Sequence, residues 1–482
     1  MEKPDYAYLL PFEIWRECFL LLGITEYKNL AKTCSYFYDI CLPLIFKSIT
    51  YSSKITYFKR DPPESLVLQL ERLREELGHF LGLGTSRRHI HLVRECTVSY
   101  SLRVGPSVDK TRAKAAKGAY NPFIQAFVKF LPAFVNLRKV QIMFSKNIDK
   151  KVLRALAMAP RLQDVSFISA KFGVHQLSPP LNISKFSIDN VAQDRDSNRS
   201  AKILDLCSSE SLEDLSVLSW VYAPKIFLAL TKKGKLQNLT SLSFQLHVRD
   251  HVQTLYSFLA VCPKLELIEM ELRFLGDLKQ LPELPSSTIR HLRSFSGPIS
   301  AAKILIPTRP VRKVRLSYEV LSRRTTAELE DIFHHLSEST GPLTHLTMES
   351  LNCRADVLAM ITAHFHSLTQ LSLGLDNCRI FPDDAEDPHT INLANILHWI
   401  ALRRISLPPR LEVLHFEKTF CWSDFLDKLE REFYTSPMAN AIFDILSIHY
   451  PKLRSVVVSE RTEKLSWFRD LSGNWAYLGR QS

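Results

Sequence analysis

The chain has 482 residues, of which 46% are hydrophobic and 23% are charged, and its formal net charge is +12. This composition is typical of a globular protein and excludes a disordered chain. No apolar run approaches the ~18 residues that a membrane-spanning helix needs, so we expect no membrane segment.

The nine cysteines form no Cys-x-x-Cys pair, and the first residues lack the layout of a secretion signal. We therefore expect an intracellular protein, cytoplasmic or nuclear, with reduced thiols. The positive charge is compatible with nucleic acid, an acidic membrane surface or an acidic protein as partner. The basic residues are mostly scattered, and we expect the one local cluster, from Arg103 to Lys117, to be a solvated loop. The sequence therefore favours neither nucleic acid nor membrane as a partner.

The first fifty residues predict a small helical unit. Pro11 suits the first turn of a helix, and Ile14, Cys18 and Leu22 fall on one face after it. Apolar residues then recur at spacings of three and four from 27 to 41, and we expect Pro43 to end this second helical segment. The unit carries more apolar surface than two or three short helices can bury. It is either a cap on the next domain or a docking surface for a partner's helices.

Residues 9–50 contain, in order, a Leu-Pro pair, an acidic and an aliphatic residue, a Leu-x-x-x-Cys-x-x-Phe segment and an aliphatic-aromatic step. This ordered set resembles the F-box, which in its family binds the Skp adaptor of cullin-based ubiquitin ligases. The resemblance implies that the residues that bind the adaptor, or support those that do, are Leu10, Pro11, Ile14, Phe19, Leu30, Cys34 and Phe37.

The segment after this unit predicts a linker and then an amphipathic helix. Residues 51–62 are polar and end in Asp-Pro-Pro, which is typical of a break. The helix is indicated by apolar residues spaced by three and four, and we expect its apolar stripe to lie on the next domain. These residues are Leu66, Leu70, Leu73, Leu77 and Phe80.

From residue 93 onward the chain repeats a template of apolar-x-x-apolar-x-apolar. Copies begin at residues 93, 137, 162, 183, 212, 239, 265, 311, 343, 368, 411 and 453, with a weaker copy at 292. Between copies lie helix-like segments, one of which opens at Thr325 with Glu328 in capping-box spacing. One strand and one helix cannot bury their apolar faces alone, so stacked copies must bury them on one another.

This pattern resembles the irregular leucine-rich repeats that F-box proteins carry, although the Asn or Cys after the strand occurs only near residues 352 and 377. The predicted fold class is α/β, with a helical F-box at 1–50 and a linker and amphipathic helix at 51–92. A curved solenoid of about 12 to 13 repeats, made of short parallel strands and helices, is expected at 93–482. The alternative is the core strands of another α/β fold.

In each copy the residue between the last two apolar positions is expected to face outward from a strand. Most of these residues are small or polar, which suits a face open to a partner and equally a face that binds nothing. Lys313 and Arg315 fall in one repeat and can receive a phosphate or carboxylate. The candidate target-binding residues are Lys313, Arg315, His345, Thr347, Ser372 and His415.

No motif predicts enzyme chemistry. Nucleotide-binding glycine loops and the Gly-x-Ser-x-Gly motif are missing. His364 and His366 lie near Cys353 but lack a second close pair of metal ligands. We therefore expect no cofactor and no metal.

The resemblance implies a non-catalytic substrate-recognition subunit of a Skp–cullin–F-box ubiquitin ligase. Its partners would be the Skp adaptor, cullin through that adaptor, and an unidentified target protein. One alternative is a leucine-rich-repeat scaffold outside any ligase, with the F-box-like helices as a solenoid cap. The other, suggested by the net charge alone, is a nucleic-acid-binding protein.

Overall fold

The computed structural model divides the chain into two compact units, residues 1–238 and 239–482, and each is described by itself. Most of the predicted loop from Arg103 to Lys117, and the Asn-Cys pairs near 352 and 377, lie outside the described residues. The structure describes residues 10–58, 62–104, 111, 114, 118, 120–144, 147–172, 176–189, 203–246, 248–272, 284–317, 325–351, 355–375, 393–418, 437–460 and 463–481.

The first unit begins with three helices, α1 (Phe12–Phe19), α2 (Ile24–Leu30) and α3 (Ser35–Phe46). Pro11 is the N-cap of α1, one residue before the first helical turn in which the sequence placed it. The centre of the helical unit is formed by Phe19, Ile40 and Cys41, which are at most 3% exposed. Around them pack Trp15, Tyr27, Leu30, Ala31, Tyr36, Phe37, Leu44 and Ile45.

The prediction for the second helical segment is wrong in two respects. The segment is two helices with a break at residues 31–34, and Pro43 lies inside α3 instead of ending it. A proline inside a helix removes one backbone hydrogen bond. The residues after it compensate through packing, because Leu44 and Ile45 contact the core and the Phe46 ring stacks on His89 with centroids 4.6 Å apart.

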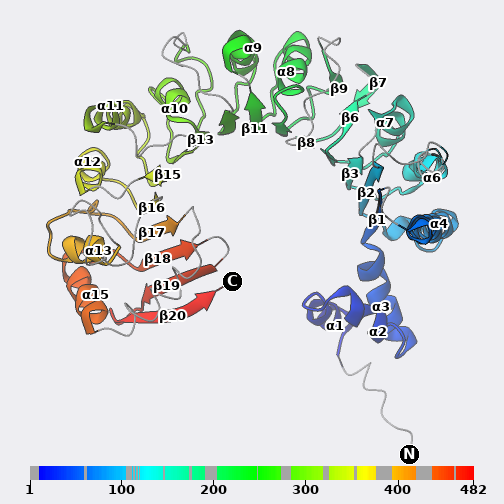
Figure 1. Cartoon of the computed structure of the whole chain (residues 1–482), viewed down its shortest axis with the longest axis horizontal. Coiled ribbons are helices and arrows are strands. Elements are labelled where there is room, and N and C mark those ends of the chain that lie inside the picture. The colour runs from blue at the N-terminus through cyan, green and yellow to red at the C-terminus, as the bar shows by residue number, and fades with distance from the viewer. Residues whose placement is uncertain are drawn as a thin grey trace, which may run out of the picture. The chain divides into compact units, whose positions relative to one another are not determined.

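The sheet of the first unit is parallel, with strand order β1-β2-β3-β5-β8-β10. Figure 1 shows the helices that connect these strands on one face of the sheet, and in each unit we call the face opposite its connecting helices the open face. The strands are β1 (Ser48–Tyr57), β2 (Glu95–Val104), β3 (Lys139–Phe144), β5 (Asp164–Ile168), β8 (Lys185–Asp189) and β10 (Asp214–Leu218). The helices are α4 (Pro63–Thr85), α6 (Tyr120–Phe130), α7 (Lys150–Ala157) and α8 (Ala223–Lys232). Two small sheets pair β4 (Asn147–Ile148) with β6 (Lys171–Phe172), and β7 (Gln176–Leu181) with β9 (Asp205–Cys207).

The expected linker from residue 51 is instead mostly strand. One residue, Lys47, separates α3 from β1, and β1 pairs with β2 along its whole length. The polar residues of this segment alternate with buried Ile55 and Tyr57, as they do in a half-buried strand. The first strand of the sheet therefore follows the helical unit directly.

The predicted amphipathic helix is confirmed as α4. Leu66, Leu73 and Phe80 on its stripe are 6%, 3% and 0% exposed. The Phe80 ring lies within 6.4 Å, centroid to centroid, of four phenylalanine rings and packs edge-on against Tyr51 of β1. This aromatic cluster attaches α4 and α6 to the first strand of the sheet.

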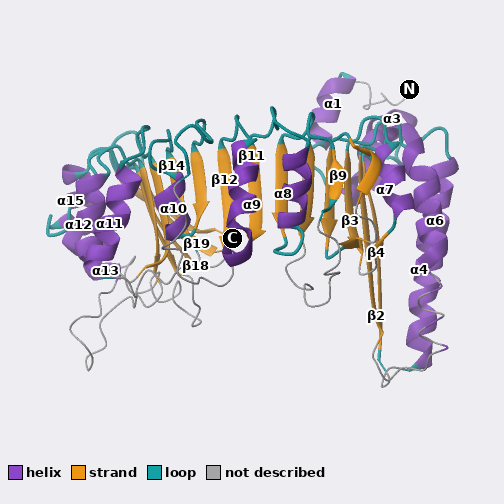
Figure 2. Ribbon diagram, turned by 90° about the horizontal axis from the view of Figure 1, so that it is seen from above, coloured by secondary structure: helices purple, strands orange, loops and turns teal. Residues whose placement is uncertain are grey.

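The second unit continues the same architecture and ends differently. Its strands β11 to β18 are parallel neighbours in chain order, and β19 and β20 add an antiparallel end. Figure 2 shows the helices standing in front of the orange strands. The strands are β11 (Ser241–Leu246), β12 (Leu267–Leu272), β13 (Ser294–Gly297), β14 (Lys313–Leu316), β15 (His345–Leu351), β16 (Gln370–Leu375), β17 (Val413–Lys418), β18 (Ser455–Glu460), β19 (Glu463–Arg469) and β20 (Trp475–Gln481). The helices are α9 (Val248–Ala260), α10 (Ile299–Leu305), α11 (Thr326–Ser337), α12 (Ala355–His364), α13 (Leu393–Ala401) and α15 (Pro437–His449).

The repeat template is confirmed as the strand signal. Every copy, including the weaker one at 292, begins two residues before a strand of the main sheet. Its last two apolar residues enter the core, as shown by Val140 and Ile142 in β3 and by Leu414 and Phe416 in β17, which are all 0% exposed. The chain is therefore an α/β repeat solenoid preceded by a helical unit.

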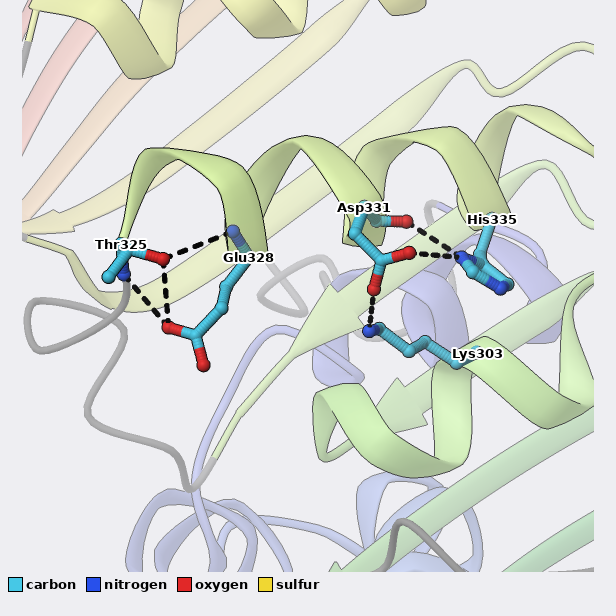
Figure 3. Close-up of polar contacts among 5 residues, drawn as sticks. All are labelled: Lys303, Thr325, Glu328, Asp331 and His335. Atoms are coloured by element: carbon cyan, nitrogen blue, oxygen red, sulfur yellow. Dashed lines mark hydrogen bonds and ion pairs between the residues drawn. The ribbon is translucent and has the colours of Figure 1, made fainter.

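Polar contacts fix the start and the packing of α11 (Figure 3). The Thr325 hydroxyl accepts from the Glu328 N–H, and the Glu328 carboxylate accepts from the Thr325 N–H, which confirms the predicted capping box. Asp331 on the same helix pairs with Lys303 of α10, and this bond lowers the pKa of the Asp331 carboxyl. Neighbouring repeats are thus joined by side chains as well as by the sheet.

Candidate functional site

The structure divides the seven predicted adaptor-binding residues into two groups. Phe19 is 3% exposed, and its ring lies 5.3 Å from that of Phe37, which is partly buried. Leu30 also packs against this core. Cys34 caps α3, with its Sγ accepting from the Phe37 N–H at 3.5 Å. These four residues hold the helices together. Phe19 is buried, whereas Leu30, Cys34 and Phe37 keep part of their surface exposed.

The other three predicted residues lie at the surface. Leu10 is 40% exposed and Ile14 is 47% exposed, and Pro11 between them is also exposed. Five further apolar side chains, which were not among the predicted binding residues, are exposed on α1, on the turn after it and at the start of α2. They are Phe12, Leu20, Leu21, Leu22 and Ile24, with exposed fractions of 39%, 49%, 88%, 38% and 48%.

We call these eight residues the docking patch. The run of three leucines before Gly23 was the available signal for its second half, because three consecutive apolar residues at the end of a short helix cannot all face its core. Soluble proteins rarely expose large apolar patches without a binding role. The docking patch is therefore the main candidate interaction surface of the helical unit.

A different side of the helical unit contacts the repeats. The loop that follows α4 places Arg88 over the Tyr38 ring, 5.3 Å from its centroid, and 3.8 Å from the Asp39 carboxylate. In the same loop His89 stacks on Phe46, and burial is the first cause that lowers the pKa of its imidazole. The contact with the repeats is thus made through α3, while the docking patch lies on α1 and the turn after it.

The open face of the first unit carries charges that alternate across strands. Glu95, Lys139, Asp164, Lys185 and Asp214 lie opposite one another in register on β2, β3, β5, β8 and β10. The Lys139 ammonium is 3.5 Å from the Asp164 carboxylate. Opposite charges at facing positions stabilise a sheet. The charges of this row therefore largely neutralise one another.

The open face of the second unit brings together all six predicted target-binding residues. Lys313 of β14 lies opposite His345 of β15. Two residues further along, at the next outward-facing position, four adjacent strands align a second row. It consists of Arg315, Thr347, Ser372 and His415. The six residues thus form one polar surface across four strands.

The basic pair in this surface is partly neutralised within the protein. The Arg315 guanidinium contacts the Glu349 carboxylate, with its Nε donating at 2.7 Å. Glu349 occupies the next outward position of β15 after Thr347. An acidic target group must therefore compete with Glu349 for Arg315, whereas among the described residues Lys313 has no acidic partner.

His415 is the most constrained side chain of the six. Its Nδ1 lies 3.1 Å from the Ser372 hydroxyl and its Nε2 lies 2.8 Å from the Ser459 hydroxyl. Burial lowers the pKa of the imidazole, nearby Lys464 lowers it further, and Glu417 opposes both. Burial therefore favours the neutral ring, which lies between two hydroxyls.

We expect His415→Gln to reduce the loss of stability that the chain shows on acidification. Because burial lowers the folded-state pKa of His415, the unfolded chain binds more protons once the pH falls below its unfolded pKa of about 6.5. The stability associated with neutral His415 is therefore present above that pH and is lost as the pH falls through the folded pKa. Melting temperatures at pH ~7.5 and ~5.5 measure the effect. An equal acid-induced drop in the variant and the wild type would contradict it.

No group of three or more His, Cys, Asp or Glu side chains that could hold a metal ion occurs among the described residues. Cys353 lies outside them, and the His364 ring packs 6.2 Å from that of Phe333. Within the described part of the chain, no helix is both long and apolar enough to cross a membrane.

Comparison with known proteins identifies one part of the chain. Residues 8–48 match the F-box domain family. No curated protein matches the chain. Among solved structures, a chain of the Rad7 and Elc1 complex in yeast is 15% identical with a TM-score of 0.34, and the match covers 79% of this chain and 90% of that chain. The leucine-rich repeat-containing protein LegL7 from Legionella pneumophila is 11% identical with a TM-score of 0.32, covering 89% of this chain and 92% of that chain.

Proposed function

Because residues 8–48 form an F-box domain, we propose that the chain is the substrate-recognition subunit of a Skp–cullin–F-box ubiquitin ligase. The F-box binds the Skp adaptor and through it cullin, and the repeat solenoid binds the target protein. The chain does no bond chemistry of its own. It contributes proximity, by holding a lysine of the target near the activated ubiquitin.

The observation that carries this proposal is the exposure of the docking patch. Its side chains are apolar, and Leu10 and Ile14 remain 40% and 47% exposed in the folded chain. Fully burying one such side chain contributes about 1.5–3 kcal/mol. A partner that covers several of them gains enough free energy to offset the cost of association and bind at micromolar concentration or below.

The same observation argues against the helices being only a solenoid cap. A cap would pack its apolar surplus on the first repeat, but that contact is made by Tyr38, Asp39 and Phe46 of α3. The docking patch lies on a different helix and stays exposed. This arrangement supports a partner-binding role for α1 and the turn after it.

We place target recognition on the open face of the second unit. The facing charges of the first unit's open face alternate in sign, so a charged target gains little there. In the second unit, Lys313 adjoins His345 in register and has no acidic partner among the described residues. We propose a protein segment with acidic or phosphorylated residues as the target, in an intracellular compartment, with neither nucleic acid nor membrane as the bound surface.

Co-expression with the Skp adaptor tests the proposal. The full chain should co-purify with the adaptor at equal stoichiometry and remain bound through gel filtration. A chain that folds, as judged by cooperative melting, but elutes without the adaptor would overturn the ligase assignment. The variants that localise the contact are described in the Discussion.

A further inference from the structure

Three cations occupy equivalent positions just before the first three strands of the sheet. They are Lys47 before β1, Arg94 before β2 and Arg138 before β3, and all three side chains are exposed. The main chain aligns them, because the Arg94 N–H donates to the Lys47 carbonyl at 2.9 Å and the Arg138 N–H donates to the Arg94 carbonyl at 2.7 Å. We call these three residues the basic ridge.

The ridge differs from the row that immediately follows it. The residues that directly follow the ridge are Ser48, Glu95 and Lys139. Across β2, β3 and β5 this next row places Glu95, Lys139 and Asp164 opposite one another with alternating charge. Like charges at facing positions destabilise a sheet, and opposite charges stabilise it. One residue earlier, the chain keeps three like charges about one strand spacing, ~4.8 Å, apart. Their mutual repulsion is a cost that the fold itself does not require.

No acidic side chain among the described residues forms an ion pair with any of the three cations. In the second unit, the equivalent position before β13 holds Arg293, and it lies 3.7 Å from Glu266 before β12. The fold can therefore place an acidic side chain next to a cation at this position. In the first unit no acidic side chain occupies the equivalent positions beside the three cations of the ridge. The ridge is left available to an external anion.

Further cations surround the ridge. Arg87 and Arg88 lie in the loop before β2, and both are exposed. Arg161 donates to the Asn136 amide oxygen at 2.8 Å, and the Asn136 amide donates to the His91 carbonyl at 2.6 Å. The loops before β2, β3 and β5 are thus tied together and present several positive charges, with Asp39 beside Arg88 as the one acid described in ion-pair contact with them.

We propose that the basic ridge binds an acidic segment of the adaptor protein that docks on the F-box. This inference rests on the proposed function, and its place in the fold supports it. Lys47 is the C-cap of α3, the last F-box helix, and lies within the residues that match the F-box domain. A protein seated on the F-box that extends along the edge of the sheet reaches Arg94 and then Arg138 within two strand spacings.

The ridge supplies charge where the docking patch supplies apolar area. Complementary charge accelerates encounter and fixes the orientation of a complex, and its contribution declines as salt screens it. Apolar burial does not decline in this way. The two surfaces can therefore be separated by the salt dependence of adaptor binding.

The test measures the association rate and affinity of the full chain for the purified adaptor from ~0.05 to ~0.5 M salt. In the ridge variant, Arg94→Glu is combined with Arg138→Glu. Its matched control combines Arg410→Glu with Lys452→Glu, which changes the net charge equally at exposed loop positions before β17 and β18. At low salt we expect the ridge variant to associate at least about tenfold more slowly and to lose most of its salt dependence. The control should bind like the wild type.

The outcomes separate this inference from the proposed function. A folded wild-type chain that does not bind the adaptor would overturn the proposed function, whereas adaptor binding that survives Ile14→Asp would overturn only the assignment of the docking patch. Binding that is lost in Ile14→Asp but is unchanged in the ridge variant would overturn the ridge assignment alone. If the wild type binds a single-stranded oligonucleotide and the ridge variant loses only that activity, the ridge belongs to a nucleic-acid site and the inference is also overturned. Equal melting temperatures of the variants confirm that folding is not the cause.

Discussion

Ile14→Asp is expected to abolish retention of the adaptor and to leave the chain folded. The Ile14 side chain is 47% exposed before binding, so an aspartate is solvated there and the helix is retained. In the complex the same carboxylate would be buried against apolar groups without a partner, which costs several kcal/mol. A loss of about 3–5 kcal/mol weakens binding by roughly 10²- to 4 × 10³-fold. Surface plasmon resonance or pull-down of the full chain measures the loss.

The matched control is Val67→Asp on α4. Val67 is also an apolar helical residue at the surface, with an exposed fraction of 53%, and it lies outside the F-box. It should bind the adaptor as the wild type does. Phe19→Ala is not a suitable probe, because Phe19 is 3% exposed and its truncation costs about 3–5 kcal/mol of folding free energy. Wild-type affinity in Ile14→Asp would show that the adaptor does not contact the docking patch.

Arg309→Met is expected to lower the stability of the second unit by about 3–5 kcal/mol. Arg309 is 1% exposed, and its side chain is the largest fully buried one among the described residues. It donates at 3.0–3.3 Å to six main-chain carbonyls, those of Leu284, Pro285, Thr288, Ile304, Leu305 and Pro307. Methionine fills similar space but leaves these carbonyls buried without donors. The site uses the five N–H donors that a guanidinium holds in one plane, and a lysine ammonium has only three. Arg309→Lys should therefore lose most of the same free energy of unfolding.

For a unit of this size, the loss corresponds to a drop in melting temperature of about 10 °C. Calorimetry should resolve it, and hydrogen exchange at residues 284–309 should show faster opening there than in the first unit. Arg312→Met is the control, because Arg312 lies three residues away and is exposed. A melting temperature within ~2 °C of the wild type for Arg309→Met would contradict a structural role for the buried guanidinium.

The helix and strand pattern was largely predictable. The template copies locate their strands to the residue, and the helices at Pro63–Thr85 and Thr326–Ser337 follow from apolar spacing and a capping box. These signals are local, because a strand alternates its side chains and a helix returns to one face every three or four residues. The F-box pattern is equally local, and the match to residues 8–48 confirms it.

Two parts of the sheet were missed for identifiable reasons. The segment from Phe46 to Tyr51 fits the repeat template, but its first apolar residue is also the last residue of α3, so the strand is concealed by the helix before it. The sequences of strands β19 and β20 do not match the repeat template. Their pairing is antiparallel and depends on contact with β18, which a repeat pattern does not encode.

By itself, the sequence determined the F-box, the repeat architecture and the residues that alternate between core and surface, because each depends on spacing along one segment. Only the tertiary structure decided which apolar residues of the F-box are core and which form the docking patch, since Phe19 and Ile14 share a helix and differ only in what packs against them. It also decided the basic ridge. Lys47, Arg94 and Arg138 lie more than forty residues apart in the chain, and they become neighbours because parallel pairing with helical crossovers places the starts of successive strands side by side.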